Sequence, residues 1–178
     1  MNITRTAAIA AIGTLGAVTV AATLAAQSGA DAARAERAEA TLVDASGTVV
    51  GSARFTEDGG GRVHVIVRVS GLTPGLHGIH VHGAGACTPT FDAAGSHHNP
   101  LSRLHGEHAG DLPNLTVNRG GHGRLQATVD SFTLSAGPTG AFDGDGSSLV
   151  VHALPDDGVT QPTGGSGARV VCGVIVPR

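Results

Sequence analysis

The sequence lacks lysine, tryptophan and tyrosine, and it has only four phenylalanines among 178 residues. A core with so few aromatic rings must be built from Val, Leu, Ile and Ala, which favours strands over an aromatic-lined binding groove. The net charge is only −3, and every basic side chain is arginine. No basic patch of the kind that binds nucleic acid is present in the sequence, so we expect no nucleic-acid partner.

Residues 1–32 differ from the rest of the chain. A short positive start at residues 1–5 is followed by an uncharged run at residues 6–26 that is rich in Ala, Leu, Ile and Val. This is the layout of a secretory signal peptide, with small-residue cleavage positions after Ala25, Ser28 or Ala32. An uncleaved membrane anchor is the alternative, because the run is close to the length that spans a bilayer. We expect cleavage and export, which leave a secreted or cell-envelope domain at 33–178 without a stable membrane partner.

The chain has two cysteines, Cys87 and Cys172. An oxidising compartment outside the cell favours a disulfide between them and leaves no odd thiol. A metal-thiolate role is the alternative, which the abundance of histidine makes the weaker one. The sequence therefore predicts one long-range disulfide.

The pattern after residue 39 is typical of an antiparallel all-β domain. Short alternating runs are separated by Gly, Asp, Asn and Pro. In the segment 62–69 the four valines occupy one face, and Arg62, His64 and Arg68 share the other face with Ile66, so we expect His64 to face solvent. The runs predict about eight strands, at 40–44, 48–56, 62–70, 76–83, 114–118, 123–129, 148–152 and 169–176.

Three long segments do not read as strands: 83–110, 130–146 and 153–168. Irregular segments of this length in a compact domain tend to be functional. The first and third adjoin strand ends that carry histidine. The middle one has no metal-binding residue set, so we interpret it as a crossover connection.

Histidine is the abundant chemical group, with ten in the chain and seven of them between His77 and His108. In the segment 78–82, His80 and His82 share one face of a strand, because side chains alternate. A solvated strand edge would show the same pattern. Together with His152, at the end of an apolar strand, the pair could supply a planar nitrogen set suited to copper.

A second set of ligand types lies in the first long segment. Imidazole nitrogens and a carboxylate are the ligand mix of a tetrahedral zinc site. Only Gly106 and Glu107 separate two of the histidines, so a zinc site here needs a tight turn. The candidate residues are His97, His98, His105, His108 and Asp111.

At these residues the sequence resembles the copper/zinc superoxide dismutases, specifically the secreted bacterial branch. The resemblance covers residues 38–178. Its motifs are the segments 71–82, 94–100, 108–114, 150–152 and 167–175, together with Cys87 and His105.

The resemblance implies an eight-stranded antiparallel Greek-key β-barrel or sandwich, immunoglobulin-like, with long metal-binding loops. It also implies an enzyme that converts superoxide to oxygen and hydrogen peroxide by redox cycling of copper. The implied copper ligands are His80, His82, His97 and His152, and the implied zinc ligands are His97, His105, His108 and Asp111.

The resemblance gives roles to further residues. His97 would bridge the two metals and carry a proton, Arg169 would orient superoxide, and Asp156 would link ligands of the two metals without binding a metal itself. His77 would be structural. Because the segment 153–168 lacks the acidic and lysine-rich guidance residues of many relatives, we expect steering to depend mainly on Arg169. His98 stands where relatives often have an apolar or aromatic residue, and we interpret it as a loop-packing or exposed residue, with a spare ligand as the alternative.

Two rival functions stay open at the level of sequence. One is a copper-only dismutase with an empty second site, and the other is a copper-binding or copper-carrying sandwich domain without turnover. The four copper-type histidines and Arg169 favour catalysis. Monomer and homodimer are both compatible with the sequence.

Overall fold

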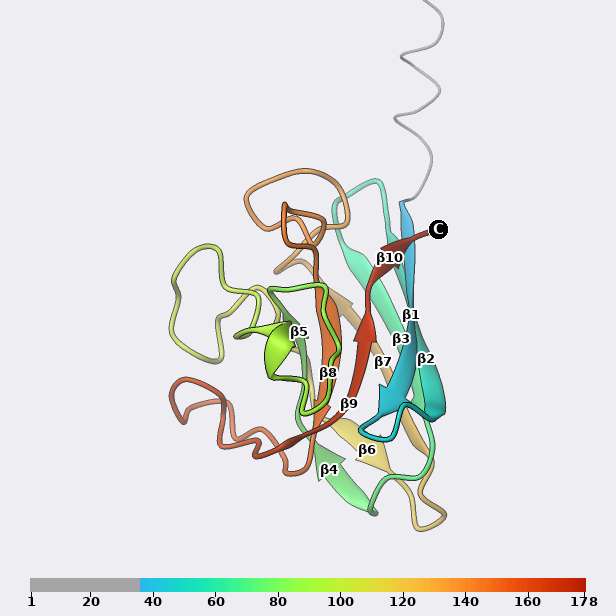
Figure 1. Ribbon diagram of the computed structural model, residues 1–178. Helices are drawn as coiled ribbons and strands as arrows, with labels where there is room; N and C mark the ends of the chain where they lie inside the picture. The colour runs from blue at the N-terminus through green and yellow to red at the C-terminus, as the bar shows by residue number, and fades with distance from the viewer. Residues whose placement is uncertain (1–35) are drawn as a thin grey trace, which may run out of the picture. The chain divides into compact units, whose positions relative to one another are not determined.

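The computed structural model describes residues 36–178 as a nearly closed antiparallel β-barrel (Figure 1). The expected signal peptide at 1–32 and the first residues of the expected domain lie outside the described residues. Within residues 36–178, no helix is long and apolar enough to cross a membrane. The strands are β1 Arg37–Asp44, β2 Val49–Glu57, β3 Val63–Val69, β4 Gly75–His77, β5 Ile79–His82, β6 Leu115–Val117, β7 Gly123–Val129, β8 Ser148–His152, β9 Arg169–Val174 and β10 Val176–Pro177.

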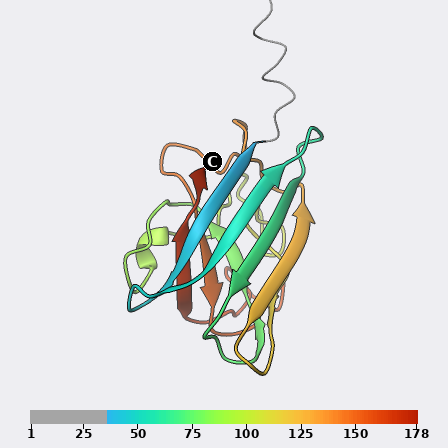
Figure 2. The ribbon, with the colours of Figure 1, turned by 90° about the vertical axis from the view of Figure 1, so that its right-hand side faces the viewer.

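The strands form one sheet in the order β4-β6-β7-β3-β2-β1-β9-β8-β5, and β10 pairs with β1. Figure 2 shows β1, β2, β3 and β7 side by side in one layer, with β5, β8 and β9 behind them. The alternation predicted for β3 is confirmed, because its four valines are buried while His64 and Arg68 are exposed. This single-face burial fixes the register of the layer against the core.

Two of the eight predicted strands are each divided in two. At Gly78 the chain leaves β6, the partner of β4, and joins β8, the partner of β5. The Gly78 amide donates to the Leu154 carbonyl, and the His152 amide donates to the Gly78 carbonyl, both at 2.8 Å. A side chain at Gly78 would collide with Ser166, since a Cβ there would lie 2.7 Å from the Ser166 Cβ. The segment 75–82 therefore supplies both ends of the sheet and brings the barrel close to closure.

The three long segments are irregular, as expected, apart from a short 3₁₀ helix, η2 at Asp92–Ala94. The segment 130–146 connects β7 to β8 and is fixed to the barrel at two points. Phe132 packs edge-to-face on Phe55 with 6.4 Å between ring centroids. The buried Glu57 carboxylate accepts hydrogen bonds from the Leu134 amide and from the amide and hydroxyl of Ser135, at 2.7 to 2.8 Å. The interpretation of this segment as a crossover connection is confirmed.

Candidate metal centre

β5 forms the base of the centre because both of its edges are occupied by segments that carry histidine. One edge pairs with β8, which ends at His152. Along the other edge, the Val81 amide donates to the Gly110 carbonyl at 2.9 Å and the Val81 carbonyl accepts from the His98 amide at 2.8 Å. This pairing places His97 opposite His82 and Asp111 opposite His80. The backbone thus places His97 and His152, which are 15 and 70 residues after His82 in the chain, beside the same strand.

Four buried histidines form the first group: His80, His82, His97 and His152. One nitrogen of each lies within 4.8 Å of the corresponding nitrogen of every other. Three of the rings are fixed through their other nitrogen: His80 Nε2 donates to Asp156 at 2.5 Å, His82 Nδ1 to the Gly95 carbonyl at 2.9 Å, and His152 Nδ1 to the Gly167 carbonyl at 3.1 Å. A fixed donor on one side of an imidazole leaves the lone pair on the other side.

The nitrogens left over in this group have no protein hydrogen to accept. His80 Nδ1 and His97 Nε2 are buried without any hydrogen-bond partner, and His82 Nε2 and His152 Nε2 face each other at 3.4 Å. Buried polar atoms are normally paired, since leaving one unpaired costs about 1–3 kcal/mol. Several converging lone pairs are the arrangement that a metal cation would satisfy, so these residues fit a copper ion chemically.

The second group consists of His97, His105, His108 and Asp111, again with ligand atoms within 4.8 Å of one another. Asp111 Oδ1 lies 3.0 Å from His97 Nδ1 and 3.4 Å from His108 Nδ1, and Asp111 Oδ2 lies 3.4 Å from His105 Nδ1. His105 Nδ1 is buried without a hydrogen-bond partner. Gly106, at φ +93°, allows the turn that two intervening residues require. Three imidazoles and a carboxylate fit a tetrahedral zinc ion.

Asp156 joins the two groups from outside. One carboxylate oxygen accepts from His80 Nε2, and the other accepts from His105 Nε2 at 2.9 Å. Asp156 is itself held by Asn114, whose side-chain amide bonds both the amide and the carbonyl of Asp156 at 2.8 Å. The expected link between the two ligand sets is therefore present as a pair of hydrogen bonds.

The electrostatics favour cation binding by three imidazoles of the first group and by the carboxylate of the second group at neutral pH. Burial lowers the pKa of His82 to about 2, of His80 to about 3 and of His152 to about 4, and repulsion from His97 adds to each shift. Burial works against ionisation of Asp111, but hydrogen bonds from His97 and the Gly106 amide outweigh it and lower the pKa of Asp111 to about 2. The three imidazoles are thus neutral and the carboxylate is charged, so these groups need release no proton to take up a metal.

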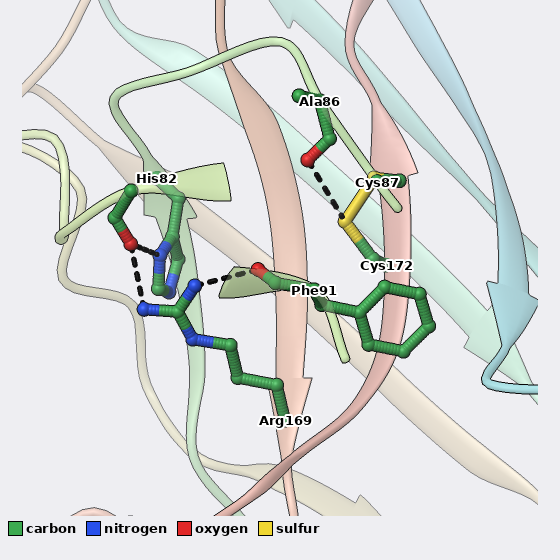
Figure 3. Close-up of a disulfide and its surroundings, with 7 residues drawn as sticks. His82, Ala86, Cys87, Phe91, Arg169 and Cys172 are labelled. Atoms are coloured by element: carbon green, nitrogen blue, oxygen red, sulfur yellow. Dashed lines mark hydrogen bonds between the residues drawn. A yellow bond between two sulfur atoms is a disulfide. The ribbon is translucent and has the colours of Figure 1, made fainter. Parts of the chain in front are cut away.

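Arg169 lies beside the first group and is held by two carbonyls. Its guanidinium donates to the Phe91 and Gly95 carbonyl oxygens, each at 2.6 Å (Figure 3). The disulfide between Cys87 and Cys172 is formed, as the sequence predicts, and the buried Phe91 ring packs in the same small apolar cluster as Cys172. The disulfide and the Phe91 ring thus pack together next to the Phe91 carbonyl that holds Arg169.

A pocket of about 450 Å³ opens over the first group. His82, His97, His152 and Arg169 reach it from the interior, and the rim comes from the two long histidine-flanking segments. No carboxylate is among the described residues that line it: His82, Ser96, His97, Asn99, Arg103, His108, His152, Gln161, Pro162, Thr163, Gly167 and Arg169. Its chemistry suits a small anion approaching the four histidines.

The comparisons with known proteins agree with this geometry. Residues 49–175 match the family of copper/zinc superoxide dismutase. The chain belongs to the copper/zinc superoxide dismutase family. Copper and zinc are the metals of this family, its members are oxidoreductases, and superoxide is their substrate.

Individual relatives are similar over most of their length. The chain is 40% identical over 148 residues to a Cu-Zn superoxide dismutase of Caulobacter vibrioides, covering 78% of this chain and 84% of the relative. It is 37% identical over 147 residues to a Cu-Zn superoxide dismutase of Aquifex aeolicus, covering 78% and 85%. The structure resembles the Cu/Zn superoxide dismutase of Brucella abortus, with a TM-score of 0.66, 31% identity, and 78% and 99% of the two chains covered. A SOD-like protein of Bacillus subtilis aligns with a TM-score of 0.71 at 34% identity, over 78% and 97%.

The remaining histidines lie where the sequence indicates. His77 is buried, with Nδ1 donating to the His152 carbonyl at 2.6 Å, which is a structural contact. His98 donates to the Thr139 carbonyl at 3.2 Å and is buried, so it packs within the loop and is not exposed.

Four residues around the centre are not indicated by the sequence. The Phe91 and Gly95 carbonyls cannot be found from residue types, because every residue carries a carbonyl. Asn114 lies within the motif at 108–114, but its hydrogen bonds to Asp156 join residues 42 positions apart. Arg103 has no place in the motifs, although it lines the same pocket as Arg169.

Proposed function

We propose that this chain removes superoxide at a copper centre held by His80, His82, His97 and His152, with zinc held by His97, His105, His108 and Asp111. The observation that carries the assignment is the pair of four-residue ligand groups that share His97, in which buried lone pairs converge without hydrogen-bond partners. When bound, copper supplies reversible one-electron transfer and zinc supplies positive charge at the far side of the shared imidazole. The overall reaction takes two superoxide ions and two protons to oxygen and hydrogen peroxide.

The protein residues have three tasks in this proposal. Arg169, fixed by two carbonyls, attracts and orients the anion at the open side of the histidine group. When its Nε2 is not a copper ligand, the imidazole of His97 would hold a proton there and pass it to the reduced oxygen species, while its Nδ1 stays toward the second group. Asp156 orients His80 and His105 and keeps their proton on Nε2, so that Nδ1 of each remains a ligand atom.

A His152→Ala variant tests the copper assignment. Removing one of four nitrogen ligands should lower copper retention and cut kcat/KM for superoxide by about 100-fold or more. Substituting a residue that only orients a metal ligand lowers affinity or activity by about 10- to 100-fold, and loss of a ligand itself should cost at least as much. His122→Ala is the matched control, since His122 is exposed in the turn after β6. Undiminished activity of His152→Ala would refute the ligand assignment.

The rival functions have separate outcomes. Stoichiometric zinc in protein refolded with both ions would exclude a copper-only centre. Failure of the copper-loaded protein to accelerate superoxide decay beyond free copper would favour a copper-carrying domain without turnover.

We also propose that the chain is exported and cleaved after Ala25, Ser28 or Ala32. The disulfide is compatible with an extracellular or periplasmic compartment, where such bonds persist. The mass of the mature protein purified from its native compartment would give the cleavage site, and a mass that includes residues 1–25 would support the anchor instead. Sedimentation of that protein would separate monomer from homodimer.

A further inference from the structure

We propose that Arg103 is a second anion-guiding residue, which acts with Arg169 to draw superoxide into the pocket over the histidine group. The inference rests on the proposed role of that pocket as the superoxide entrance. It assigns a task to a residue outside both ligand groups.

Arg103 lies at the same pocket as Arg169, although the two residues come from different segments. It comes from the segment 83–110, whereas Arg169 begins β9, yet both line the same pocket of about 450 Å³. Arg103 is exposed and Arg169 is half-buried. Arg103 thus belongs to the outer rim, and Arg169 to the inner wall beside His82 and His152.

The backbone of Arg103 is fixed although its side chain is exposed. The Asn99 side chain accepts from the Arg103 amide and donates to the Arg103 carbonyl, both at 2.9 Å. The Ser102 amide closes the same turn on the Asn99 carbonyl at 3.1 Å. A charge anchored in this way stays at the rim instead of moving with a flexible loop.

The charge of Arg103 is also not neutralised. Among residues 36–178, neither Arg103 nor Arg169 forms a salt bridge, whereas Arg62 and Arg178 do. A separate pocket next to His105 has Asp111, Asp156 and Asp157 among its lining residues. Of these two pockets, the one over the first group therefore has the lining charges that favour an anion.

No carboxylate is among the described residues that line the pocket, so the two arginines set the sign of the side-chain charge at this entrance. Positive residues at a cleft can raise the association rate of an anion by about 10- to 1,000-fold in total. One rim charge contributes a small share of that factor. The effect must fade with salt, because the screening length falls from about 30 Å at 0.01 M to about 3 Å at 1 M.

The test is the ionic-strength dependence of kcat/KM for superoxide, measured with Arg103→Gln at equal copper and zinc content. We expect a decrease of about two- to threefold at 0.01 M salt and no difference near 1 M. Arg103→Lys should restore the rate, since it restores the charge. Arg54→Gln is the matched control, because Arg54 is exposed on β2 in the opposite layer and the substitution removes the same charge.

A binding measurement gives a second readout. Azide, a monoanion that coordinates copper, should bind the loaded Arg103→Gln protein more weakly at low salt and with unchanged affinity at high salt. Arg169→Gln separates the two proposals. If Arg169→Gln slows the reaction and Arg103→Gln behaves like Arg54→Gln in both measurements, the guiding role of Arg103 is wrong. If Arg169→Gln is also without effect, the proposed entrance itself is wrong.

Discussion

The imidazole of His82 and the guanidinium of Arg169 donate hydrogen bonds to the same acceptor, the carbonyl oxygen of Gly95. In Figure 3 the dashed lines from the two side chains meet at one oxygen. A proposed copper ligand and the anion-orienting arginine thus share one backbone support. Any change that shifts this carbonyl displaces both groups together.

The disulfide should contribute to this support as well as to stability. It closes a loop with a sequence separation of 85, for which the chain-entropy model gives about 4–5 kcal/mol. The double variant Cys87→Ser, Cys172→Ser should therefore lose about 2–5 kcal/mol of unfolding free energy and also lose kcat/KM at equal metal content. Urea unfolding with and without reductant measures the first effect. A wild-type unfolding free energy that does not respond to reductant would contradict it.

Asp156→Asn should weaken one of the two metal groups. An amide presents an N–H to one of the two histidines that now donate to Asp156, so one ring loses its orienting acceptor. We expect copper or zinc affinity to fall by about 10- to 100-fold. Competition with a chelator measures it, with the exposed Asp130→Asn as control. Equal affinities in the two variants would show that Asp156 has no orienting role.

The Glu57 carboxylate should be a principal anchor of the crossover segment. The Leu134 amide and the Ser135 amide and hydroxyl all donate to the Glu57 carboxylate. In Glu57→Gln one of the two accepting oxygens is replaced by an NH₂ group, which is itself a donor and faces these donors. The expected loss is about 1–3 kcal/mol of unfolding free energy. Glu36→Gln, at an exposed position, is the control and should change stability little. Identical urea midpoints for both variants would contradict the anchoring role.

The metal-free protein should lose stability as the pH falls below 6.5. The folded pKa values of His80, His82 and His152 lie at about 3, 2 and 4, against 6.5 as the ordinary value, so the unfolded chain binds more protons in this range. Each group lowers the unfolding free energy by about 1.4 kcal/mol per pH unit, or about 4 kcal/mol for the three between pH 6 and 5. The stability is present above pH 6.5 and decreases toward pH 4.

Denaturation of the metal-free protein at pH 7, 6 and 5 checks the slope. In His82→Gln the unfolding free energy should change less steeply with pH, by about 1.4 kcal/mol per pH unit, because glutamine does not titrate. Equal stability at pH 7 and pH 5 would mean that the histidines are not held neutral.

The sequence predicts the strands of this barrel well because burial of one face imposes a period of two, as in β3. It also indicates part of the first histidine group, since His80 and His82 need only a strand to share a face. It cannot indicate the division at Gly78, because that depends on the change of partner from β6 to β8. The carbonyl supports at Phe91 and Gly95 are equally invisible, since they arise from loop conformation and carry no side-chain signature.

The central claim is that two metals share His97. The most direct measurement is the copper and zinc content of His97→Ala and His122→Ala after reconstitution with both ions and removal of free metal. The proposal predicts one copper and one zinc per chain in His122→Ala, and weakened retention of both metals in His97→Ala. Loss of only one metal from His97→Ala, with the other retained as in the control, would contradict it.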